Sequence, residues 1–243
     1  MNILVCISHV PDTTAKIAFT DNNTKFDSNG VQFIICPYDD YALARSVELK
    51  QSNDAHVTVL NVGLAETEPT IRKALAIGAD EAIRVNAQPI DALFVAEQIA
   101  EVVKNGNYDL IMMGRESIDY NGGQVHAMVG EMVGIPAISP VMTLDIDGNL
   151  AKMSREIEGG KEFLEVEMPF IAGCQEPIAE WIIPNMRGIM TARSKPLNVI
   201  EPVDSSTSQS ITAYELPPEK GGVKIVETVE ELVDLLKNEA KVI

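Results

Sequence analysis

The sequence has few cysteines, and those it has do not pair in any familiar motif. Cys6, Cys36 and Cys174 are odd in number and far apart, with no CxxC spacing. The pattern therefore predicts neither a disulfide framework nor a zinc site. A chain of this kind is best suited to a reducing compartment.

Basic residues are also scarce. The 243 residues include 19 Lys and Arg against 36 Asp and Glu, which gives a formal net charge of −17. Such a chain is not expected to bind nucleic acid or an anionic membrane surface by charge. No apolar run approaches the roughly 18 residues of a membrane span. The opening MNILVCISHV is apolar at once, without a basic leader, so we expect a buried strand and a cytoplasmic protein without membrane insertion.

Motifs for hydrolytic or metal chemistry are missing. There is no GxSxG elbow, no HExxH pair and no nucleophile with an evident neighbouring base. His9, His56 and His126 lack metal-ligand spacing. We expect no metal site and no catalytic residues in this chain, so it is predicted not to be an enzyme alone.

Strand and helix patterns alternate through the first half of the chain. Apolar, β-branched runs predict strands at 3–10, 31–35, 56–63, 81–85 and 110–114, and helical periodicity predicts helices at 37–50, 68–77, 90–104 and 123–133. Regular alternation predicts an α/β fold with a doubly wound parallel sheet. A chain of this length can form one main domain with appendages.

The pattern changes after residue 141. Alternating segments separated by DGN and GG turns predict an antiparallel extension, and 170–174 could return as another strand. Prolines then recur from Pro184 to Pro218, so we expect an α/β domain over 1–184 and a C-terminal arm over 185–243. Thr228 is the expected N-cap of a terminal helix. That helix could pack on its own domain or on a partner subunit, and the sequence does not decide between these.

The loop after 110–114 is the clearest candidate for ligand binding. A strand, a polar loop with Gly122 and Gly123, and a helix start would place backbone N–H groups where a phosphate could bind. The loop is neither GxGxxG nor a lysine-bearing P-loop. Taken by itself, the loop favours a structural turn over a nucleotide contact.

Several segments together are more specific. In order along residues 1–200, the chain resembles the electron transfer flavoprotein beta family in the segments ILVCISHVPDTTAKI, FIICPYDDYALARSVELK, TIRKALAIGADEAIRV, GRESIDYNGGQ, REIEGGKEFLEVEMPFI and IPNMRGIMTAR. The resemblance implies a Rossmann-like sheet of the adenine-nucleotide-binding type. It also implies a heterodimer in which an alpha subunit holds most of an FAD.

In that family the beta chain binds AMP at the strand ends. The resemblance places this site at Cys6, Cys36, Pro37, Tyr38, Asp39, Val62, Asp119, Asn121, Gly122, Gly123, Gln124 and Val125. Cys36 and Tyr38 stand where the family usually has asparagine and phenylalanine. The loop reads DYNGGQV in place of DDDCNQT, and its QV ending resembles electron-bifurcating members that bind a second FAD. AMP is the expected ligand, with a second FAD as the alternative.

The resemblance also suggests contacts with the flavin and with redox partners. Thr13, Tyr38, Arg155 and Glu156 are expected near the flavin, although the tyrosine could be an ordinary half-buried residue and the charges could simply be solvated. Glu176, Pro177 and Ile178 are expected to contact a partner, with Ile178 as an apolar anchor.

The predicted function is electron transfer in fatty acid oxidation. The heterodimer would accept electrons from soluble acyl-CoA-type dehydrogenases and pass them to a quinone-linked oxidoreductase. A universal-stress-type nucleotide-binding module shares the sheet but lacks the long hairpin and arm. An adenylating enzyme is disfavoured because no SGGxDS-like loop follows Val10.

Overall fold

The computed structural model describes residues 1–205, 209–219 and 221–243. The chain divides into two compact units. The larger, called the body, comprises Met1–Ala18 and Asp27–Ile211, and the smaller unit comprises Phe19–Phe26 and Thr212–Ile243.

The body is built on a nine-stranded sheet within the described residues, in the order β11-β10-β9-β12-β8-β1-β6-β7-β13. From β9 to β13 the neighbouring strands are parallel, whereas β10 pairs antiparallel with β9 on one side and with β11 on the other. The antiparallel extension predicted from the turns is therefore confirmed. The strands are β1 (Asn2–Cys6), β6 (His56–Val62), β7 (Glu81–Val85), β8 (Leu110–Gly114), β9 (Ala137–Asp147), β10 (Leu150–Ile157), β11 (Gly160–Glu167), β12 (Phe170–Cys174) and β13 (Leu197–Ile200).

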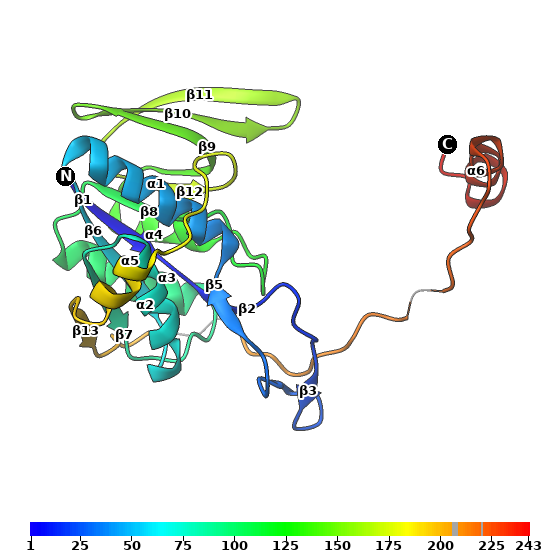
Figure 1. Cartoon of the computed structure of the whole chain (residues 1–243), viewed down its shortest axis with the longest axis horizontal. Helices are drawn as coiled ribbons and strands as arrows, with labels where there is room; N and C mark the ends of the chain where they lie inside the picture. The colour runs from blue at the N-terminus through cyan, green and yellow to red at the C-terminus, as the bar shows by residue number, and fades with distance from the viewer. Residues whose placement is uncertain (206–208, 220) are drawn as a thin grey trace. The chain divides into compact units, whose positions relative to one another are not determined.

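Helices cover both faces of the sheet (Figure 1). One apolar cluster joins the sheet to α1, α2 and α5, and a second joins its other face to α3 and α4. This arrangement confirms the predicted Rossmann-like, doubly wound α/β fold. The helices are α1 (Pro37–Asn53), the 3₁₀ turn η1 (Ala65–Thr67), α2 (Glu68–Ile77), α3 (Ala92–Asn105), α4 (Val125–Val133) and α5 (Met186–Ala192).

Strand β8 shows why the central strands are apolar throughout. All its residues are buried, and successive side chains alternate between the two clusters, with Leu110 and Met112 on one face and Ile111 and Met113 on the other. A strand covered on both sides needs apolar residues at every position, which is why its sequence shows no alternation.

The first strand is shorter than its apolar run predicts. β1 ends at Cys6, and His9–Pro11 (β2) pairs antiparallel with Phe33–Ile35 (β5) in a separate ribbon. Just beyond the strand, the Ser8 amide donates to the side chain of Asp39 at 2.7 Å. A side-chain acceptor therefore takes the place of the next strand partner.

The proline-rich stretch after residue 184 contributes to the body. α5 packs on α2, and β13 extends the sheet beside β7. Arg72 fixes this segment by donating to the carbonyls of Ala192 and Lys195 at 2.9 and 2.8 Å. The expected boundary at Pro184 thus differs from the observed division, because prolines are compatible with an edge strand that they only flank.

The smaller unit contains a short hairpin and the terminal helix. The hairpin is formed by β3 (Phe19–Thr20) and β4 (Lys25–Phe26), and its Phe19 ring stacks on Tyr214 with centroids 4.9 Å apart. Helix α6 (Val229–Leu235) continues into a π-helical turn, η2 (Leu236–Ala240). The predicted cap is confirmed, since the hydroxyl of Thr228 accepts from the Glu231 amide at 3.2 Å.

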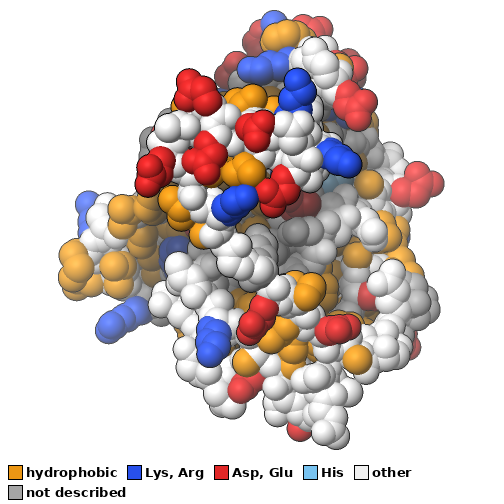
Figure 2. Space-filling view, turned by 90° about the vertical axis from the view of Figure 1, so that its right-hand side faces the viewer, with side chains coloured by type: hydrophobic (Ala, Val, Ile, Leu, Met, Phe, Trp, Pro, Cys, Tyr) orange, Lys and Arg blue, Asp and Glu red, His pale blue; other side chains and the backbone are white. Residues whose placement is uncertain are grey.

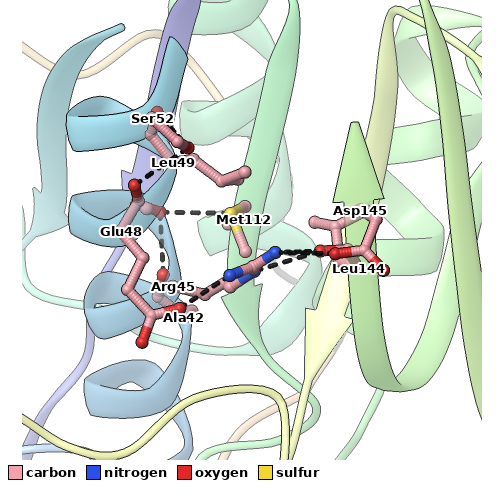
Figure 3. Close-up of polar contacts among 9 residues, drawn as sticks. Ala42, Arg45, Glu48, Leu49, Ser52, Met112, Leu144 and Asp145 are labelled. Carbon is pink, nitrogen blue, oxygen red and sulfur yellow. Dashed lines mark hydrogen bonds and ion pairs between the residues drawn. The ribbon is translucent and has the colours of Figure 1, made fainter. Parts of the chain in front are cut away.

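One arginine joins helix α1 to the antiparallel extension (Figure 3). Arg45 donates from Nε to the Leu144 carbonyl in β9 at 3.1 Å, and it pairs with Glu48 at 2.7 Å and Asp145 at 3.2 Å. On the same helix, Ser46 donates to the Ala42 carbonyl at 2.7 Å. The bonds of Arg45 to Leu144 and Asp145 link α1 to β9, which pairs antiparallel with β10.

The surface reflects the composition. The face in Figure 2 carries acidic side chains mixed with lysines and arginines, and hydrophobic side chains are exposed between them. None of the helices in the described part of the chain has the length and apolarity needed to cross a bilayer.

Candidate functional site

The candidate site lies where the strand order reverses. β1 is central, the chain builds the sheet through β6 and β7 on one side, and it then returns to β8 and β12 on the other. Cys6 ends β1, Gly114 ends β8 and Val62 ends β6, so these residues lie at one edge of three adjacent parallel strands. Open α/β sheets bind ligands at this edge, at the reversal point.

Asp39 holds the two sides of the reversal point together. It lies in the first turn of α1, where Pro37 takes the first position, and is only 4% exposed. One carboxylate oxygen accepts from the Ser8 amide and the other from the Gly114 amide, both at 2.7 Å. Burial raises the pKa of this carboxyl to about 7, and the two amide bonds act in the opposite direction.

Both oxygens of Asp39 are therefore used by the protein itself. Its direct contact with a nucleotide remains a prediction, whereas its bonds to Ser8, just after β1, and to Gly114, at the end of β8, are visible in the structure. Gly114 makes the close approach possible, because a Cβ there would lie 2.6 Å from Tyr38 Cβ and 2.7 Å from an Asp39 oxygen.

The cysteines line this region as neutral thiols. Cys6, Cys36 and Cys174 are free and buried. Burial raises the pKa of each thiol, and the nearby Asp39 carboxyl raises it further. The Cys36 thiol donates to the Glu116 carbonyl at 3.4 Å, which ties the α1 N-terminus to the loop after β8.

That loop, called the glycine loop below, runs from Arg115 to Gln124 and leads into α4. Asn121 and Gly123 have φ values of 49° and 58°, and the Asn121 amide donates to the Ser117 carbonyl at 2.8 Å. The Ser117 hydroxyl donates to Asp119. A Cβ at Gly122 would meet no atom within 4 Å, so the backbone there is open to close approach.

The start of α4 suits an anion. Val125 is its first residue, and Gln124, at the N-cap, makes no side-chain capping bond. The first amide groups of a helix lack helical acceptors and carry the positive end of the helix dipole. The structure therefore provides backbone donors beside the glycine loop, as the sequence predicts.

Tyr38 is half-buried beside this loop. The guanidinium of Arg115 lies over its ring, 5.7 Å from the centroid. Thr13 is exposed and belongs to a segment that borders a hollow of about 320 Å³, lined by Asp12, Thr14, Ala15, Lys16, Asn29, Gly30, Val31 and Gln32.

The hairpin charges have specific partners. In β10, Arg155 pairs with Glu162 of β11 at 2.5 Å, and the Glu156 carboxylate accepts from the side-chain amide of Gln175 at 2.9 Å. Both contacts are made within the chain. Arg115 and Gln175 carry no signal in the sequence. They are identified only by the hydrogen bond between their side chains, at 2.8 Å.

The expected partner-binding residues differ in exposure. Glu176 and Pro177 are exposed, and Glu176 accepts from the Tyr41 hydroxyl at 3.2 Å. Ile178 is 6% exposed and packs in the core, so it does not present an apolar anchor at the surface. The exposed apolar side chains of the following segment are Trp181 and Ile183, at 59% and 72%.

His9 has two contacts within the chain. His9 shares a hydrogen bond of 2.8 Å with the Thr70 hydroxyl and stacks on Phe33, and burial lowers the pKa of His9 and of His126. Among the described residues, no group of His, Cys, Asp and Glu side chains is arranged to bind a metal ion.

Comparison with known proteins gives a consistent result. Residues 24–205 match the family model described as the electron transfer flavoprotein domain. The chain is 32% identical to the electron transfer flavoprotein subunit beta of Bacillus subtilis, with all of both chains covered. It is 31% identical to the human protein of the same name, over 98% of this chain and 97% of that one. The Clostridium acetobutylicum protein is 35% identical over 70% of this chain and 67% of its own.

Proposed function

The chain belongs to the electron transfer flavoprotein family as a beta subunit, and we propose that it pairs with an alpha subunit to form a flavin-dependent electron carrier. When bound, FAD supplies the redox chemistry, and the alpha subunit holds most of it. This chain is then a platform without turnover of its own. Residues 185–243, which include α6, are proposed to contribute to the contact with the alpha subunit.

We infer that the sheet edge binds AMP. The observation that carries this assignment is the meeting of β1, β8, the glycine loop and the start of α4 at the reversal point of the sheet. In a protein with a net charge of −17, a phosphate needs local N–H donors, and this edge offers them. The proposed contacts are Cys6, Cys36, Pro37, Tyr38, Asp39, Val62, Asp119, Asn121, Gly122, Gly123, Gln124 and Val125. A bound nucleotide would stabilise the folded chain.

Four residues are proposed to face the flavin across the subunit interface. The Tyr38 ring can pack against the flavin edge, and its contact with Arg115 restricts its position. Thr13 and the hairpin residues Arg155 and Glu156 are proposed to orient the flavin or to stabilise the heterodimer.

The complex is proposed to act in the cytoplasm, in fatty acid oxidation. It would accept electrons from soluble acyl-CoA-type dehydrogenases and deliver them to a quinone-linked oxidoreductase. The docking segment, residues 174–183, would meet the dehydrogenase. Because Ile178 is buried, the exposed Trp181 and Ile183 are better suited to enter a partner pocket.

The decisive experiment counts nucleotides. The chain is co-expressed with its alpha subunit, the heterodimer is purified, and the released nucleotides are quantified. One FAD and one AMP per complex are expected. Two FAD and no AMP would replace the AMP assignment with a second flavin, and a colourless homodimer would overturn the carrier.

A matched pair of glycine variants tests the position of the AMP. Gly123→Ala and Gly148→Ala both place a side chain at positive φ, 58° and 62°, but Gly148 lies in the β9–β10 turn. Gly123→Ala is expected to reduce the AMP recovered with the heterodimer, whereas Gly148→Ala is not. Equal recovery from both variants would remove the glycine loop from the site.

A further inference from the structure

Gln175 connects two charged side chains at the candidate site. It follows β12 directly and is 7% exposed. Its Oε1 accepts from Arg115 Nη1 at 2.8 Å, and its Nε2 donates to Glu156 Oε2 at 2.9 Å. Both ends of one amide are thus occupied, one by a cation and the other by an anion.

The direction of this amide is determined by its neighbours. A guanidinium can only donate hydrogen bonds and a carboxylate can only accept them, so the oxygen must face Arg115 and the nitrogen must face Glu156. The backbone is fixed as well. The backbone N–H of Gln175 donates to the Val141 carbonyl at 3.0 Å, and the backbone N–H of Arg115 donates to the Cys174 carbonyl at 2.9 Å.

The bridge joins three segments that are distant in sequence. Arg115 begins the glycine loop, Glu156 lies in the β10–β11 hairpin, and Gln175 lies at the start of the docking segment. Arg115 also contacts Glu116 at 3.5 Å and the Tyr38 ring. The chain of contacts therefore runs from the docking segment to the side chains proposed to face the flavin.

A neutral amide is the side chain that suits this position. A glutamate would repel Glu156, a lysine or arginine would repel Arg115, and an apolar residue would leave both charges without this partner. Without the amide between them, the two opposite charges could also close on each other. Gln175 keeps them apart, and both stay accessible, with the Arg115 side chain 38% exposed.

We propose that Gln175 is a positioning residue that holds Arg115 and Glu156 in place on the face for the alpha subunit and couples that face to the docking segment. This rests on the proposed function. Movement of the docking segment would displace the Gln175 amide and, through it, both charges. Dehydrogenase binding and the fit of the alpha subunit would then affect each other.

The test is a charge swap with a rescue, measured first in the full chain alone. Gln175→Glu places two carboxylates together. Adding Glu156→Gln in the same chain restores a bond, because the amide introduced at position 156 can donate to the carboxylate introduced at position 175. In urea unfolding, the double variant is expected to be more stable than the sum of the single effects predicts. If the changes in the free energy of unfolding of the two single variants simply added up in the double variant, the bridge would be overturned. This outcome does not depend on flavin binding.

The coupling is then measured in the heterodimer. Gln175→Glu is expected to raise the KM of a dehydrogenase for the heterodimer and the dissociation constant of the alpha subunit, each roughly tenfold, as for loss of a bond to a charged group. The double variant should recover most of both losses. Glu165→Gln, an exposed change in β11 outside the bridge, is the control and should change neither value.

Two failures can be distinguished. Wild-type protein that forms no flavin complex with an alpha subunit would overturn the proposed function. A wild-type complex that forms normally, together with a Gln175→Glu variant that changes only one of the two constants, would overturn the coupling alone.

Discussion

Helices α3 and α6 begin in the same way and end in different environments. Asp91 caps α3 by accepting from the Phe94 amide at 2.8 Å, and Thr228 caps α6 in the same manner. α3 buries Phe94 and Ile99 in the body, but α6 in the smaller unit buries none of its residues. A local start signal therefore determines where a helix forms, and packing against other elements determines what it contributes to stability.

The largest expected effect tests this contrast in aromatic residues. Phe170 is fully buried in the body, and Phe19 stacks on Tyr214 in the smaller unit. Phe170→Ala is expected to lower the free energy of unfolding by about 3–5 kcal/mol, because it leaves a cavity. Phe19→Ala should change it by less than about 1 kcal/mol. Urea unfolding of the two variants measures the difference, and similar losses would contradict it.

A second effect concerns the buried carboxyl of the body. The pKa of Asp39 is raised from 3.8 to about 7 on folding, so between these values the folded chain binds more protons than the unfolded chain. Its contribution to stability is thus present below about pH 4 and is lost as the pH rises to about 7. Asp39→Asn should flatten this part of the profile in urea unfolding at several pH values. If the free energy of unfolding of the variant still changed with pH as in the wild type, Asp39 would not be the group that titrates in this pH range.

A third effect compares a crowded strand end with an open turn. Gly114→Ala forces a Cβ against Tyr38 and Asp39, and should cost about 1–3 kcal/mol of stability by overpacking. Gly160→Ala, where no atom lies within 4 Å, should stay within about 0.5 kcal/mol of the wild type. Thermal unfolding measures both variants. Equal effects would show that the edge around Asp39 can relax.

The smallest expected effect concerns the N-caps of α3 and α6. Thr228→Ala should destabilise α6 by about 0.5–2 kcal/mol, because one amide loses its acceptor. Hydrogen exchange should show faster opening of α6 while the body stays protected. Asp91→Ala, by contrast, should lower the unfolding midpoint of the body. A lower body midpoint in Thr228→Ala would show that α6 stabilises the body.

Much of the fold could be predicted from the sequence. The predicted ranges of α2, β7, β8 and β12 agree with the structure, because α2 has apolar residues at helical spacing and the strands are short segments rich in apolar residues. A strand at 31–35 was predicted, but the pairing of β2 with β5 was missed, because the run at 3–10 was interpreted as one strand although Ser8 and His9 interrupt it.

The nucleotide and flavin contacts remain predictions, and only the elements that carry these residues can be compared with the structure. The strand ends and the glycine loop follow from the order of elements, and the family resemblance added the residue numbers. The burial of Ile178 could not be predicted, because a single apolar residue between Pro177 and Ala179 has the same pattern whether it faces a partner or the core. The exposed Trp181 and Ile183 gave no signal of their own.

The sequence by itself determined most of the strands and helices of the central sheet and the family to which the chain is similar, since these depend on local periodicity and on residues in a fixed order. Only the tertiary structure decided that Asp39 joins β1 to β8 and that Gln175 joins Arg115 to Glu156. Such bonds link residues that are far apart along the chain. Their geometry exists only after the sheet has brought the strand ends together.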